Sequence, residues 1–75
     1  MKIMIFDEEQ KFCGFYFKEG FAALLDDNGT PVAATSGWEC NGCIFVYRPT
    51  EDGWRGDWES EETFPVQLVL DAIQD

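Results

Sequence analysis

Two cysteines separated by two residues are the first side chains in this sequence that could do chemistry. The run Cys40-Asn41-Gly42-Cys43 has the spacing of a zinc knuckle or of a redox-active dithiol. A structural zinc site needs four ligands, but Cys13 is the one other cysteine and histidine is absent. A reactive dithiol favours a helix N-terminus, whereas Asn-Gly indicates a tight hairpin. We therefore interpret the pair as packing residues beside a turn and predict no metal and no cofactor. A Cys40/Cys43 metal or redox protein stays open as an alternative.

A second candidate site is the acidic segment between residues 51 and 62, in which six carboxylates surround two tryptophans. Carboxylates attract a basic surface over a distance, and tryptophan is enriched among the residues that carry binding energy at interfaces. We expect this segment to bind a partner protein. The residues concerned are Glu51, Asp52, Trp54, Asp57, Trp58, Glu59, Glu61 and Glu62.

The sequence offers little support for catalysis. The absence of histidine removes the commonest general base and the usual partner of a nucleophilic serine. No phosphate-binding glycine loop is present. We predict that the protein is not an enzyme and has no catalytic residues, leaving open a carboxylate pair that only the fold would bring together.

Net charge is the most unusual property of the chain, with 15 acidic residues, five basic residues and a net charge of −10. Residues 38–75 hold nine of the acids and two of the cations, a net charge of −7. Spread over the roughly 4,700 Å² that a folded chain of this mass exposes, the whole charge amounts to one per about 470 Å². DNA carries roughly one per 100 Å² of its envelope. Only a local acidic ridge would approach that density, and the alternative is a solvated acidic face that confers solubility.

In size and charge the chain is similar to phage-encoded DNA-mimic, anti-restriction and anti-CRISPR proteins, a likeness of class that no motif narrows to a family. From the acidic segment we predict an inhibitor that presents carboxylates to the basic, nucleic-acid-binding groove of a partner protein and does not itself bind nucleic acid. Trp54 and Trp58 would be its apolar anchors. An adaptor or subunit that binds through an apolar surface, such as the C-terminal helix or a strand edge, is the alternative from another class. The partner's identity and the oligomeric state stay open.

Length and composition predict one compact domain over residues 1–75. Hydrophobic residues make up 45% of the chain and aromatic residues 16%, which is too much apolar side chain for a disordered acidic tail. The apolar opening, Met1 to Phe6, is far shorter than a signal-peptide core or a membrane span of about 18 residues. An odd number of cysteines favours reduced thiols. We therefore expect a cytoplasmic protein that does not enter a membrane.

The pattern of apolar residues and turns predicts the elements that position these side chains. Asn28-Gly29 and Asn41-Gly42 indicate two hairpins, because both residue types accept a positive φ. Period-two patterns and β-forming residues predict strands at residues 2–6, 12–17, 21–25, 32–35, 38–40 and 43–48, with a last strand or extended loop at 54–58.

The end of the chain changes to a helical period. Val66, Val69, Leu70 and Ile73 form one apolar stripe at helical spacing, and Thr63 is the expected N-cap. The sequence therefore predicts an α+β fold: an antiparallel sheet of about five strands with one C-terminal helix packed on a face.

Overall fold

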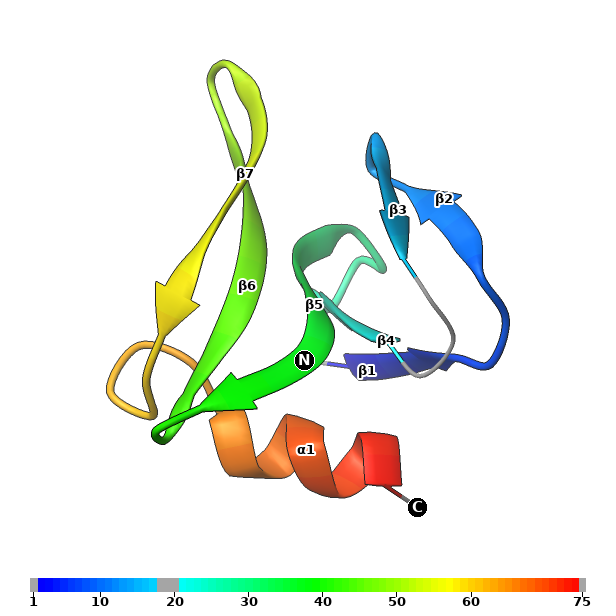
Figure 1. The fold of residues 1–75 in the computed structure, drawn as a ribbon. Helices are drawn as coiled ribbons and strands as arrows, with labels where there is room; N and C mark the ends of the chain where they lie inside the picture. The colour runs from blue at the N-terminus through cyan, green and yellow to red at the C-terminus, as the bar shows by residue number, and fades with distance from the viewer. Residues whose placement is uncertain (1, 18–20, 75) are drawn as a thin grey trace.

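The computed structural model describes residues 2–17 and 21–74 and has the α+β architecture that the sequence predicts (Figure 1). A curled antiparallel sheet holds five strands, and a separate two-stranded hairpin and one helix complete the fold. In spatial order the sheet runs β1 (Lys2–Phe6), β4 (Phe21–Leu25), β5 (Pro31–Cys40), β6 (Cys43–Thr50) and β7 (Gly53–Glu59). The hairpin consists of β2 (Gln10–Phe12) and β3 (Phe15–Phe17), and the helix is α1 (Val66–Gln74).

The long strand β5 gives the sheet its curl. Its register with β6 shifts between Thr35 and Glu39, and such irregularities bend a strand and increase its twist. Figure 1 shows β5 curving between β4 and the long β6–β7 hairpin. Aromatic rings of this hairpin contact rings of the β2–β3 hairpin, Tyr47 with Phe15 and Trp54 with Phe12.

One face of the sheet packs against α1. Val66, Val69 and Leu70 are buried in a cluster with Ala22, Leu24, Ala33, Ile44, Val46 and Phe64, and Ile73 packs against the same cluster. The predicted apolar stripe of the helix is therefore confirmed. At nine residues the helix is far shorter than the roughly 20 residues that cross a bilayer, and no helix within residues 2–17 and 21–74 is long and apolar enough to do so.

The other face of the sheet packs against an aromatic layer. The rings of Phe6 and Phe21 are stacked with centroids 4.3 Å apart, and those of Phe17 and Phe21 are stacked at 4.5 Å. The β2–β3 hairpin supplies Phe17 and also Phe12 and Phe15 to this layer. The domain thus has three layers, in the order helix, sheet and aromatic hairpin.

The single strand predicted over residues 12–17 is wrong, because the chain turns in its middle. Cys13 and Gly14 have φ angles of +52° and +89°, and Phe12 pairs with Phe15 across this tight turn. Two central residues with positive φ are what a tight hairpin of this kind requires. The turn lets Phe12 and Phe17 both reach the aromatic layer.

The two Asn-Gly hairpins form, but only one uses both residues as expected. Asn41 and Gly42 have φ angles of +54° and +79°. At the other hairpin only Gly29 has a positive φ, and the loop is held by Asp26, whose carboxylate accepts hydrogen bonds from the N–H groups of Asn28 and Thr30, both at 2.9 Å. The hydrogen bonds to Asp26 therefore stabilise a longer loop here in place of the two-residue turn that the sequence predicts.

The prediction of Thr63 as the helix N-cap is also wrong. Helix α1 begins at Val66, and the N–H of Val69 donates to the carbonyl of Pro65 at 3.2 Å. The N–H of Thr63 instead donates to the carbonyl of Ser60 at 3.1 Å in the preceding turn. A proline disfavours helical geometry in the residue before it, so the helix cannot extend back through Phe64.

Two leucines of α1 allow a matched test of this packing. Leu70 is 7% exposed and Leu68 is 60% exposed. We expect Leu70→Ala to lower the free energy of unfolding by about 2–5 kcal/mol and Leu68→Ala to change it by less than about 0.5 kcal/mol. Urea unfolding followed by circular dichroism measures both values. Equal losses in the two variants would contradict the orientation of the helix.

Candidate protein-binding surface

The β6–β7 hairpin carries most of the predicted binding segment. Its register runs from Thr50 opposite Gly53 at the turn to Ile44 opposite Glu59 at the other end. Successive side chains of a strand point to opposite faces, so Trp54 and Trp58 lie on one face. Asp57 and Glu59 lie on the other. The predicted tryptophans and the carboxylates of this strand are therefore separated by the sheet itself.

The two tryptophans differ in what they contact. Trp54 is half-buried and packs against the aromatic layer, with its ring centroid 6.5 Å from that of Phe12. Trp58 is 47% exposed, and its one ring contact among the described residues is Phe45, at 5.3 Å and an interplanar angle of 78°. Trp58 is therefore the tryptophan that a partner could reach.

Gly56 lies between the tryptophans on the same face, and two rings cover it. A Cβ atom built on Gly56 would lie 2.6 Å from Cε2 of Phe45 and 2.8 Å from Cε1 of Tyr47. Tyr47 is in turn held by Phe15, with ring centroids 4.5 Å apart, and by Phe17 at 5.2 Å. Aromatic rings that cover a glycine of an edge strand stabilise the strand where a side chain is missing.

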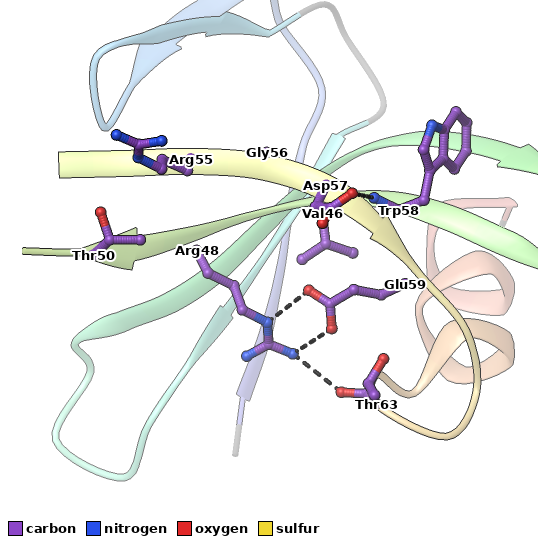
Figure 2. A pocket seen from close by; sticks show the side chains of 9 residues that line it. All are labelled: Val46, Arg48, Thr50, Arg55, Gly56, Asp57, Trp58, Glu59 and Thr63. Atoms are coloured by element: carbon purple, nitrogen blue, oxygen red, sulfur yellow. Dashed lines mark hydrogen bonds and ion pairs between the residues drawn. The ribbon is translucent and has the colours of Figure 1, made fainter. Parts of the chain in front are cut away.

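On the opposite face Arg48 and Glu59 form a bidentate ion pair (Figure 2). Nε of Arg48 donates to Oε2 of Glu59 at 2.7 Å, and Nη2 donates to Oε1 at 2.9 Å. Nη2 also donates to the carbonyl of Thr63 at 3.1 Å, and the guanidinium lies 5.7 Å from the ring centroid of Phe64. The hydrogen bonds to Glu59 raise the pKa of Arg48, which keeps the guanidinium charged. Through these hydrogen bonds Arg48 connects β6 to β7 and to the segment that follows β7.

This ion pair separates Glu59 from the other predicted site residues. The side chain of Glu59 is 14% exposed, and its charge is compensated by Arg48. A carboxylate held in this way positions the hairpin and is not available to a partner in the way that an exposed carboxylate is.

The other five carboxylates of the segment are exposed and fall into two groups and one isolated residue. Glu51 and Asp52 form the turn at the tip of the hairpin, where Oδ2 of Asp52 lies 3.6 Å from Nη2 of Arg55. Glu61 and Glu62 lie in the turn that follows β7. The strand between the two groups spans roughly 20 Å, with Asp57 along it. The structure therefore distributes these carboxylates along the length of β7.

Glu39 joins the second group, which the sequence did not suggest. Together with Glu61, Glu62 and Gln67, it lines a groove between the β5–β6 turn and the start of α1. Glu39 pairs with Ile44, which pairs with Glu59, so all three lie in one row across the sheet. This placement of Glu39 depends on the register of the β5–β6 pair and of the β6–β7 pair, which the sequence alone does not give.

The cysteines are not arranged as a metal site. Cys40 and Cys43 pair directly across the turn at Asn41-Gly42, while Cys13 lies in the β2–β3 turn. Within the described residues there is no group of three or more metal-ligating side chains that could hold an ion. Comparisons of the chain with protein-family models, curated proteins and solved structures find no match.

Substitution of Gly56 tests the aromatic cover of β7. We expect Gly56→Ala to lower the free energy of unfolding by about 1–3 kcal/mol, because the new methyl group displaces rings that Phe15 and Phe17 hold in place. Denaturant unfolding measures the change. A stabilised variant, as expected where alanine merely replaces a flexible glycine in a strand, would contradict the close approach of the two rings.

The three thiols are expected to differ in reactivity. Burial raises the pKa of the Cys13 thiol, so at pH 8 a smaller fraction of it is the reactive thiolate, whereas Cys40 is exposed. Iodoacetamide should modify Cys40 first and Cys13 last, as followed by peptide mass spectrometry. The same reaction in urea serves as the control and should remove the difference. Faster modification of Cys13 than of Cys40 in the folded protein would contradict the structure.

Proposed function

We propose that this protein is a small acidic inhibitor that binds the basic, nucleic-acid-binding groove of a partner protein in the cytoplasm. The observation that carries the proposal is the position of Trp58, which is 47% exposed on a strand with exposed carboxylates along it and beyond both ends. A large aromatic side chain that can be buried by a partner is a frequent binding hot spot. The exposed carboxylates along the strand and beyond its ends would select a basic surface.

The charge around β7 is negative after its ion pairs are taken into account. The two arginines of the hairpin are engaged by acids, Arg48 by Glu59 and Arg55 by Asp52. Among the described residues no ion pair compensates the remaining carboxylates, which are Glu51, Asp57, Glu61 and Glu62. Such a field speeds the encounter with a positively charged partner.

Local placement matters more to this function than the total charge. The accessible surface is 5063 Å², so the net charge of −10 averages one per about 500 Å², against roughly one per 100 Å² for DNA. The groove lined by Glu39, Glu61 and Glu62 gathers three carboxylates on one surface. Inhibitors of the anti-restriction or anti-CRISPR kind would use such a surface as a substitute for nucleic acid.

An adaptor that binds through an apolar surface is the second candidate. Leu68 is 60% exposed on α1, Met4 is 44% exposed on β1 and Tyr16 is 71% exposed on β3. The three side chains belong to different layers of the fold, which favours the acidic surface as the main binding site. An adaptor of this kind would bind its partner with an affinity that salt hardly changes.

Reversal of two charges at matched positions tests the proposed function. A partner captured from the native host at low salt should bind Glu61→Lys/Glu62→Lys at least about tenfold more weakly than the unmodified protein. The control, Glu8→Lys/Glu9→Lys, makes the same change in charge at two exposed residues between β1 and β2 and should reduce affinity much less. Titration calorimetry at several salt concentrations measures both effects.

The outcomes distinguish a defined acidic surface from an effect of net charge alone and from an apolar adaptor. An equal loss of affinity in both double variants would show that only net charge matters and would contradict a defined acidic surface. Affinity that is unchanged by the substitutions at Glu61 and Glu62 and by salt would favour the apolar adaptor. Glu59 is left unchanged because its substitution would release Arg48 and disturb the hairpin.

A further inference from the structure

The outer edge of β7 is uncovered in the part of the chain that the structure describes. β7 is the last strand in the order of the sheet, and no strand among residues 2–17 and 21–74 pairs with its far side. Five of its seven residues are exposed. An exposed strand edge presents backbone N–H and C=O groups that can pair with another chain.

The ladder with β6 determines which backbone groups of β7 face outward. In an antiparallel pair, residues that exchange hydrogen bonds alternate with residues that do not. Because Thr50 and Gly53 close a two-residue turn, Arg55 and Asp57 bond to β6. The backbone groups of Trp54, Gly56 and Trp58 then face away from it. In agreement, the N–H of Trp58 donates to the carboxylate of its neighbour Asp57 at 2.8 Å.

The side chains beside this edge suit cations on both faces of the sheet. A strand laid along β7 would point its side chains alternately to the face of Trp58 and to the face of Asp57. An arginine on the first face could stack on the exposed indole. An arginine on the second could donate paired hydrogen bonds to a carboxylate.

We propose that β7 binds its partner by accepting an extended, arginine-bearing segment of that protein as a sixth strand of the sheet. The inference rests on the proposed function and specifies the partner's chemistry. Backbone hydrogen bonds at Trp54 and Gly56 would supply affinity, and the alternating side chains of the added segment would supply specificity. The charge complementarity of the edge excludes a nucleic acid and favours a basic protein segment.

The same features disfavour pairing of two copies of this chain. Asp57 occupies the N–H of Trp58, and a second acidic chain would bring more carboxylates to the same edge. Charged side chains on edge strands prevent indiscriminate pairing in this way. A cationic segment would instead attract the carboxylate of Asp57. A backbone carbonyl of that segment could then accept the hydrogen bond from the N–H of Trp58.

Methylation of a single backbone nitrogen tests the proposal without changing any side chain. The 75-residue chain can be assembled by ligation at the Gly42–Cys43 junction, with and without a methyl group on the nitrogen of Gly56. That nitrogen faces away from β6, so the methylated chain should fold normally, as circular dichroism checks. The probe is an end-blocked seven-residue peptide of alternating arginine and valine, and the control is its counterpart of alternating glutamate and valine.

We expect the arginine peptide to bind the unmodified chain, to slow hydrogen exchange of the Gly56 amide, and to bind the methylated chain at least tenfold more weakly. Salt-sensitive binding that is equal in both chains would overturn strand addition while leaving the acidic surface intact. Equal binding of the glutamate peptide would overturn the choice of a cationic partner. Should the methylated chain fail to fold, slower exchange at Gly56 in the unmodified chain supports the proposal, and unchanged exchange overturns it.

Discussion

Four alanines at the centre of the sheet are the constraint on which the three-layer fold depends. Ala22 and Ala23 of β4 and Ala33 and Ala34 of β5 are each at most 1% exposed. Ala22 and Ala33 belong to the cluster under the helix, and Ala34 belongs to the aromatic cluster on the other face. Larger side chains here would force the layers apart, because close-packed interiors tolerate little added volume. Helix α1 packs on β1, β4 and β5, and among the described residues no strand pairs with the outer edge of β7.

The β6–β7 hairpin is stabilised by contacts on both of its faces. On one face Arg48 joins Glu59 to the segment before α1, and on the other the rings of Phe45 and Tyr47 cover Gly56. Together they hold a glycine-containing strand in a defined geometry although its outer edge has no described neighbour. A preordered edge loses less conformational entropy when a partner binds. The features that complete the fold are thus the ones that would prepare the acidic surface for binding.

The sequence predicts the architecture well and the details of the surface less well, for physical reasons. Strand periodicity, the Asn-Gly turns and the apolar stripe of the helix are local signals, and each predicts an element that the structure contains. The turn at Cys13 and Gly14 escapes prediction because cysteine rarely adopts a positive φ and apolar residues continue on both sides of it. The ion pair of Glu59 and the placement of Glu39 depend on cross-strand register. The binding function stays a prediction, since no comparison bears on it.

Hydrogen exchange along β7 in the free protein tests most directly whether the strand is a formed but open edge. We expect the amides of Arg55 and Asp57, which face β6, to exchange at least about a hundredfold more slowly than those of Trp54 and Gly56, which face outward. Nuclear magnetic resonance resolves these amides individually. Equal protection of all four would show that the outer edge is already covered, and rapid exchange of all four would show that the hairpin is not formed. Either result would contradict the central claim.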